Sequence, residues 1–497
     1  MADEKGYLSL LSSVGITLHH PDGLTTIPTP IGVSRRALLA EASALALSPL
    51  SHNSLAGRIA QQIRTSREPD LPSAPVPGSI TPLDFSQADE CDGRLYFSSV
   101  RFSSDQLIER LEKLGLKLQE QLETDEGDID EQINPARVAA IAEVIRRTDG
   151  RVIGGGKGLT RQAARVGAIA EAAERVVGAN PKVPVFVNSA RRLREEHGLL
   201  IPRFDVGPRD AYSDDLVIDW VKGQTLDGIV VGLPAERALY DYAPRSGVSA
   251  FTWQHTAGLA AGSSREEAIW AGLSELMERD AYWLAMRCRA RCPTIDNSIV
   301  FDARPKLAAA LGRAGLRIIM RNFSLDWPLT IVSAVAVDVT GRIPAFAHGM
   351  GSGTNLAAAA LKALLECLQL HFGLSRRCSE ARQAVLFGEV CRRPDLAWSD
   401  PGSAQELDHL LSADVDGFAI PDQSANQDSQ NILRLIREKS GDIFWVDLGE
   451  LEGVHVVRVY LPDALLPEPN LEHVPARLAT WLRRANLRYA YAIPILT

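Results

Sequence analysis

The chain of 497 residues is long enough for two or three ordinary domains, or for one large domain with an appendage. Hydrophobic residues make up 45% and charged residues 23%, which excludes a disordered or fibrous protein. The formal net charge of −9 argues against binding to nucleic acid through phosphate neutralisation. The sequence contains no apolar run of about 18 residues and no signal-peptide pattern, so we expect a cytoplasmic protein without a membrane segment.

The N-terminal part predicts three segments. Residues 1–65 are interpreted as a small unit of unknown role, with a helix around Arg35–Leu47. Residues 66–80 contain four prolines, which fix φ and remove backbone donors, so they predict an extended linker. Residues 81–497 then form the main domain, whose pattern is clearest from residue 150. An acidic run between Glu120 and Glu131 predicts a solvated loop or helix end.

From about Asp149 the sequence alternates between short apolar runs and helices rich in small residues, which predicts an α/β fold. The gaps between the runs are uneven, so we expect an α+β arrangement with a mixed sheet and packed helices rather than a doubly wound one. The predicted strands are RVIGG, VPVFVN, LDGIVVGL, LRIIMRNF, LTIVSAVAVDV and HVVRVYLP.

One pattern occurs three times after the first of these strands. A glycine precedes a polar residue by two positions, and a glutamate follows that polar residue by eleven, with small residues seven and three positions before the glutamate. Each copy predicts a glycine turn, an N-cap and a helix whose small and acidic residues share one face. The caps are Thr160, Ser264 and Asn355, the glutamates are Glu171, Glu275 and Glu366, and the residues three positions further on are Glu174, Glu278 and Gln369.

An ionised carboxylate on a packed helix face is costly unless it is paired, hydrogen-bonded or metal-bound. One interpretation is a buried network with Arg175 and Arg279, which directly follow the second glutamates. The other is a Mg²⁺ site, because Mg²⁺ prefers hard oxygen ligands. Glu267 favours the metal, since it stands eleven residues before Glu278 and three helical turns bring both onto one line. Both interpretations stay open at this point.

The glycine-rich segment Gly154–Thr160 places Lys157 and free backbone N–H groups at a predicted helix N-terminus, which is a natural cradle for an anion. It is not a Walker A motif, because Gly158 follows the lysine where that motif requires Ser or Thr. Together with the stacked carboxylates, the segment predicts binding of a magnesium nucleotide, with Lys157 as a contact.

The segments GKGLTRQAARVGAIAEAAER and GLAAGSSREEAIWAGLSELMERDAYW resemble the two signature helices of YcaO-domain proteins. The resemblance extends through GSGTNLAAAALKALLECLQ and VVRVYLP. It implies a YcaO-like fold and an enzyme that uses ATP and Mg²⁺ to phosphorylate a peptide-bond oxygen. Carried over by position, it implies that Mg²⁺ and the nucleotide phosphates are held by Glu171, Glu174, Glu267, Glu275 and Glu278, together with Ser263, Arg279 and Lys362.

The resemblance also implies a reaction: cyclodehydration of Cys, Ser or Thr to azolines in a ribosomally made, bacteriocin-like peptide, with thioamide or amidine formation as alternatives. It places the C-terminal tail beside the reaction site, which makes Thr497 the candidate catalytic residue. Two positions depart from the family pattern: Ala168 replaces a serine, and the tail has Pro494 alone instead of a Pro-x-Pro-x-Pro ending. A scaffold without chemistry, which presents substrate to a partner enzyme, therefore stays open as an alternative.

The expected partners are a precursor peptide as substrate and a separate protein that binds its leader segment, with neither nucleic acid nor a membrane. A homodimer is compatible with the sequence. The remaining candidates have ordinary interpretations: His255 as a loop residue, and Trp220, Trp253, Trp270 and Trp283 as core residues. Cys288 and Cys292 are four residues apart, but no second ligand pair lies nearby, so zinc is disfavoured.

Overall fold

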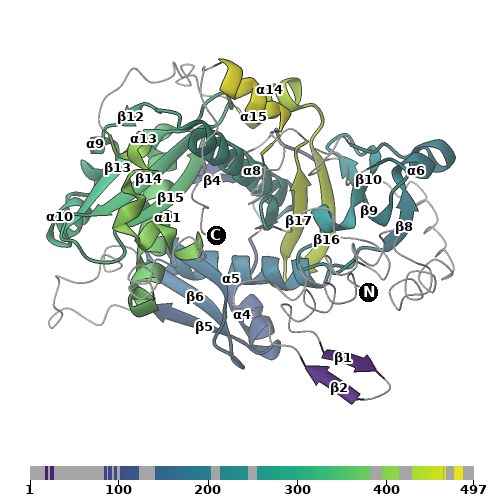
Figure 1. Ribbon diagram of the computed structural model, residues 1–497, viewed down its shortest axis with the longest axis horizontal. Helices are drawn as coiled ribbons and strands as arrows, with labels where there is room; N and C mark the ends of the chain where they lie inside the picture. The colour runs from purple at the N-terminus through teal and green to yellow at the C-terminus, as the bar shows by residue number, and fades with distance from the viewer. Residues whose placement is uncertain are drawn as a thin grey trace, which may run out of the picture.

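The computed structural model describes residues 83–86, 88–91, 94–97, 101–121, 140–202, 213–244, 255–380, 394–412, 428–462, 464–465 and 475–484. It also gives the backbone of an N-terminal hairpin, β1 (Thr17–His20) with β2 (Gly23–Thr26) (Figure 1). The expected helix at 35–47, the linker at 66–80, most of the acidic run, Trp253 and Thr497 lie outside the described residues. The proposed domain boundaries therefore stay predictions.

Three larger sheets form the framework, which confirms the α/β class. The first is β5 (Leu116–Gln121), β6 (Ala140–Arg146) and β7 (Val152–Gly158). The second has the order β10 (Val230–Pro234), β9 (Val217–Thr225), β16 (Phe444–Leu451), β17 (Val454–Tyr460) and β11 (Leu259–Gly262), with β8 (Val185–Ser189) also paired to β9. The third has the order β12 (Thr294–Ile295), β13 (Leu316–Asn322), β14 (Thr330–Asp338) and β15 (Phe346–Gly353). A small hairpin joins β3 (Asp89–Cys91) to β4 (Arg94–Tyr96).

The six predicted strands are confirmed, as β7, β8, β10, β13, β14 and β17. Every pairing among the described strands is antiparallel, and the parallel component is a single isolated bridge between Leu200 and Val231. Besides the three described next, the α-helices of the described residues are α4 (Ser104–Lys113), α6 (Ala190–His197), α7 (Ala235–Ala238), α9 (Ser298–Phe301), α10 (Pro305–Arg313), α13 (Asp408–Leu411), α14 (Ser429–Ser440) and α15 (Ala476–Arg484). Two short 3-10 helices, η3 (Pro394–Ser399) and η4 (Pro401–Ala404), precede α13.

The repeated pattern folds as three strand–cap–helix units, as predicted. Strands β7, β11 and β15 each form one edge of their sheet, and each leads directly into a long helix: α5 (Arg161–Ala179), α8 (Arg265–Cys288) or α11 (Leu356–Arg376). The side chains of Thr160, Ser264 and Asn355 cap these helices, accepting N–H groups three residues later at 3.2, 3.2 and 2.9 Å. We call these units 1, 2 and 3 in chain order.

The glycines before unit 1 lie in a strand, so the predicted glycine turn at the helix N-terminus is wrong. Val152–Gly158 pairs with β6 along its length, and the Gly155 N–H donates to a side chain of α5. Glycine is required because helix and strand touch: a Cβ at Gly156 would lie 1.8 Å from the Ala164 carbonyl oxygen. Unit 3 repeats this contact, since a Cβ at Gly349 would lie 2.2 Å from the Cys367 nitrogen. The small residues of the pattern therefore serve close packing.

The described tryptophans lie in the core, as the sequence predicts. Trp220, Trp270 and Trp283 are buried, and Cys288 and Cys292 are buried free thiols. Helix α11 is long and apolar enough, by length and composition alone, to cross a membrane. Here it packs against β14 and β15, and its buried residues belong to the core of the third sheet, as expected for a core helix.

Candidate functional site

Helices α5, α8 and α11 lie around the centre of the molecule (Figure 1). Glutamates of different units interact there, Glu174 with Glu275 and Glu278 with Glu366. The first glutamate of each unit accepts a backbone N–H from its own strand segment: Glu171 from Gly155 at 2.9 Å, and Glu275 from Gly258 at 3.0 Å. The third, Glu366, accepts from Met350 at 3.5 Å. The helical repeat thus fixes three carboxylates against three strands.

Arginines one turn later on the same helices pair with the first two glutamates. Arg175 lies 3.1 Å from Glu171, and Arg279 lies 3.4 Å from Glu275. Arg175 also contacts Glu174 at 2.9 Å. The predicted Glu–Arg network therefore exists in the protein.

The second glutamates are less well compensated. Burial raises the pKa of Glu174 well above its usual value, although Arg175 opposes the shift. Burial also raises the pKa of Glu278 to about 7, and the nearby Glu366 adds to this effect. Glu278 accepts a hydrogen bond from the Ser352 hydroxyl of β15. Two acids at the centre of the cluster thus hold protons more tightly than exposed glutamates do.

Cations from different units join the cluster. Lys157 of β7 lies 2.8 Å from Glu366, and Arg279 lies 4.0 Å from the same carboxylate. Lys362 donates to the Ser352 carbonyl at 2.9 Å, and its charge lowers the pKa of neighbouring Glu278. The structure therefore brings Lys157, Arg279 and Lys362 to the glutamates, as the sequence predicted.

Arg458 and Glu366 belong to the cluster but were absent from the predicted site. Arg458 lies on β17, is 3% exposed, and interacts with the charges of Glu174 and Glu275. It donates to the carbonyl and ring of His255, which is a loop residue as expected, and burial lowers the pKa of that ring well below its usual value. The VVRVYLP match contained Arg458, and the third copy of the repeat contained Glu366, so the sequence carried a signal for both.

Ser263 and Glu267 lie at the other end of α8. The Glu267 carboxylate accepts the Ser263 N–H at 3.2 Å, within the first turn of the helix. Eleven residues at about 1.5 Å each separate Glu267 from Glu278 by roughly 16 Å along the axis. One ion therefore cannot contact both, and the expected single row of three metal-binding carboxylates divides into two places.

The donors of the cluster fit a magnesium nucleotide. Carboxylates supply the hard oxygen ligands that Mg²⁺ prefers, and guanidinium groups bind phosphates. One terminal nitrogen (Nη1) of each of two buried arginines, Arg279 and Arg458, has no hydrogen-bond partner. Among the residues that the structure describes, no three His, Cys, Asp or Glu side chains form a metal site by themselves.

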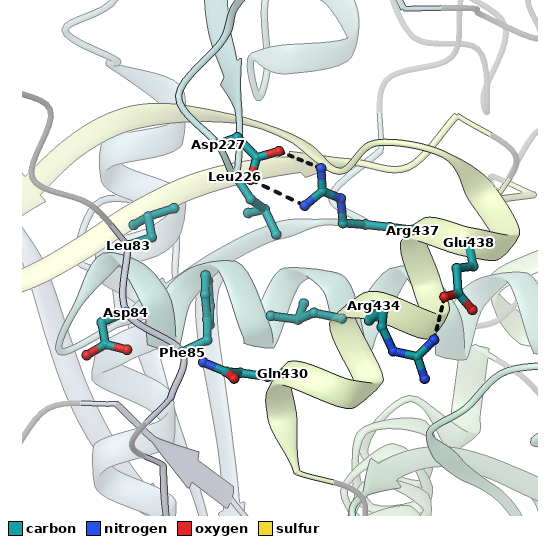
Figure 2. A pocket seen from close by; sticks show the side chains of 10 residues that line it. Leu83, Asp84, Phe85, Leu226, Asp227, Gln430, Arg434, Arg437 and Glu438 are labelled. Carbon is teal, nitrogen blue, oxygen red and sulfur yellow. Dashed lines mark hydrogen bonds and ion pairs between the residues drawn. The ribbon is translucent and has the colours of Figure 1, made fainter.

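A separate cavity of 410 Å³ lies elsewhere, between residues 83–85, the turn after β9, and α14 (Figure 2). Figure 2 shows its arginines already paired, Arg437 with Asp227 and Arg434 with Glu438. None of the predicted site residues lines this cavity.

The fold and the cluster define a protein in which three edge strands and their capped helices assemble a buried acidic and cationic site. A family model described as "YcaO cyclodehydratase, ATP- and Mg²⁺-binding" matches residues 155–465. The chain belongs to the YcaO family, and the family is one of ATP-dependent, Mg²⁺-binding enzymes.

Individual proteins agree with this placement. An uncharacterized protein of Methanothermobacter thermautotrophicus is 30% identical over 352 residues, which are 66% of this chain and 86% of that protein. A heterocyclase solved in complex with substrate and cofactor has a TM-score of 0.62 at 17% identity; the match covers 79% of this chain but only 57% of that one. YcaO from Methanopyrus kandleri, solved with AMPPCP and Mg²⁺, has a TM-score of 0.51 at 21% identity, over 73% of this chain and 91% of that one. The structural likenesses show the shared fold.

Proposed function

We propose that this protein uses ATP and Mg²⁺ to activate a backbone amide of a ribosomally made peptide, and that it closes Cys, Ser or Thr side chains into azolines. The observation that carries the proposal is that Glu174 and Glu278, whose pKa values are raised, interact with Arg458 and Arg279 respectively, and that each of these two buried arginines has a terminal nitrogen without a hydrogen-bond partner. Carboxylates with raised pKa values and guanidinium groups with spare N–H donors are the two halves of a metal–phosphate site.

The residues divide into two roles. Glu171, Glu174, Glu275 and Glu278 would hold Mg²⁺, which supplies charge neutralisation for the phosphates when bound. Lys157, Arg279 and Arg458 would bind phosphate oxygens, with Lys362 beside Glu278. Glu267 and Ser263 would contact the magnesium nucleotide from the N-terminal end of α8, away from the main cluster.

The reaction requires no nucleophile from the enzyme. The substrate side chain adds to the carbonyl carbon, the oxygen takes the γ-phosphoryl group of ATP, and the C–O bond then breaks as phosphate leaves and the C=N bond forms. Three of the described cysteines agree with this division of labour, since burial raises the pKa values of Cys288, Cys292 and Cys367 to about 12. These thiols stay protonated and unreactive.

A second candidate is the formation of a thioamide, with a sulfur donor as the nucleophile. A leader-binding partner protein is part of the proposal in either case, and a microcin synthetase complex from E. coli is among the structures with this fold. We also propose that the protein acts in the cytoplasm.

Thermal unfolding with AMPPCP tests the proposed site. We expect a strong rise in the melting temperature with Mg²⁺ and little change in EDTA, because the acids repel phosphate without the metal. An equal rise in EDTA would contradict a metal-bridged site. Phosphate release on adding a candidate precursor peptide then separates an enzyme from a scaffold, which would bind the peptide and release no phosphate.

A further inference from the structure

Glu366, the glutamate of unit 3, is not among the predicted metal ligands. It stands eleven residues after its cap, like Glu171 and Glu275, and accepts a backbone N–H from its own strand, as they do. By position in the fold it is their equivalent. Its partners, however, are different.

Units 1 and 2 pair this glutamate with an arginine four residues later, whereas unit 3 has Leu370 at that position. The cations around Glu366 come from the other two units. Lys157 approaches from unit 1 at 2.8 Å, and Arg279 from unit 2 at 4.0 Å. A single carboxylate thus links all three units.

The surroundings of Glu366 suit an ionised group that orients cations. Its side chain is 20% exposed, and that of Arg279 is 8% exposed. Burial alone would raise the pKa of Glu366, but Lys157 and Arg279 hold it below the usual value, so the carboxylate is charged at neutral pH. The Nη1 atom of Arg279 faces Glu366 beyond hydrogen-bond distance and has no other hydrogen-bond partner, so its N–H groups are available to a further acceptor.

We propose that Glu366 is a positioning residue that holds Lys157 and Arg279 side by side, so that both cations meet the nucleotide phosphates together. The proposal rests on the proposed nucleotide site. Without the carboxylate, two partly buried like charges would repel and turn apart. Unit 3 would thus contribute an internal counterion where units 1 and 2 contribute metal ligands, which agrees with the neutral Gln369 at the position of Glu174 and Glu278.

Calorimetric titration with AMPPCP and Mg²⁺ tests this role. We expect Glu366→Gln to weaken binding at least tenfold and Glu366→Asp, which keeps the charge, to recover most of the loss. The matched control is Glu143→Gln, which removes an ion pair of 2.6 Å between β6 and Arg376 of the same helix α11, and should bind AMPPCP as the wild type does. Unchanged affinity in Glu366→Gln would overturn the proposal.

A double-mutant cycle with Lys157→Met separates positioning from general destabilisation. If Glu366 acts through Lys157, the double variant binds AMPPCP no more weakly than the weaker single variant, whereas additive losses would contradict the proposal. Should Glu366→Gln fail to fold, the same cycle with Glu366→Ala, which also removes the charge, gives the same comparison. If Lys157→Met and Arg279→Gln both bind like the wild type, the nucleotide site itself is wrong; if they bind weakly and Glu366→Gln binds normally, only the positioning role is wrong.

Discussion

Helix α8 contributes residues to two buried charge clusters, which differ in whether all of their polar groups are paired. Glu275, Glu278 and Arg279 belong to the site, where one Arg279 nitrogen has no hydrogen-bond partner and the pKa of Glu278 is raised to about 7. The next residue, Asp280, is fully buried and belongs to a second cluster, which we call the α15 anchor: Asp280, Asp326, Lys439 and Arg477.

The charged groups of the α15 anchor are all paired. Asp280 accepts from Arg477 at 2.6 Å, from the Trp327 ring N–H at 2.7 Å and from the Leu465 N–H at 2.8 Å. Arg477 also binds Asp326, whose pKa is lowered to about 2 because its hydrogen bonds and ion pairs with Arg477 and Lys439 outweigh burial. A network with every group paired stabilises the fold, whereas one with spare donors and reluctant acids is arranged for a ligand. Four predictions test this contrast, from the largest effect to the smallest.

Breaking the α15 anchor should cost the most stability. Arg477→Met leaves Asp280 and Asp326 buried without their main counterion, so we expect a loss of about 3–5 kcal/mol in the free energy of unfolding. Urea denaturation measures it. A loss below about 1 kcal/mol would show that the cluster is not a stabilising network.

Neutralising a site glutamate should have the opposite effect on stability. Glu278→Gln removes a charge that burial and Glu366 disfavour, so we expect equal or greater stability together with a loss of AMPPCP–Mg²⁺ binding. Glu171→Gln is the internal comparison, because Glu171 is held by Gly155 and Arg175 and its loss should cost about 1–3 kcal/mol. Melting curves and titration calorimetry give both readouts. A Glu278→Gln variant that unfolds would place Glu278 among the structural partners.

The raised pKa of Glu278 predicts a pH dependence. Between its ordinary pKa of 4.5 and the folded value of about 7, the folded state binds more protons than the unfolded state, so this stabilisation is complete below pH 4.5 and is lost as pH rises through 7. We expect the wild type to lose about 1–3 kcal/mol more than Glu278→Gln between pH 5 and pH 8. Urea unfolding of both proteins at the two pH values measures the difference. Parallel curves would show that Glu278 titrates normally.

The smallest change in stability is expected for an exposed ion pair. Arg434 and Glu438 of α14 are both 58% exposed, so Arg434→Gln should change stability by less than about 0.5 kcal/mol. The same urea experiment checks this expectation. A larger loss would show that Arg434, which lines the cavity of Figure 2, stabilises the protein by packing as well as by its charge.

The three strand–cap–helix units can be predicted from local sequence alone. Caps, helix faces and acid positions depend on neighbours within about three turns, so Thr160, Ser264 and Asn355 and the glutamates eleven residues later could be placed in advance. The apolar runs gave the strands for the same reason, and two signature helices gave the family.

The contacts between the units, by contrast, depend on how the chain folds in three dimensions. The sequence predicts a turn at Gly156 and Gly158, because the helix backbone that excludes their side chains is not part of the local pattern. Lys157 donates a hydrogen bond to Glu366, which is 209 residues away in the sequence. Ser352 donates to Glu278, 74 residues away, and Arg477 donates to Asp280, 197 residues away. Charges of the same kind occur throughout the chain, and sequence spacing carries no information about which of them a fold brings into contact. The division of α8 into an open site and a closed anchor therefore follows from packing, where Arg279 and Asp280 are consecutive in sequence yet have different partners.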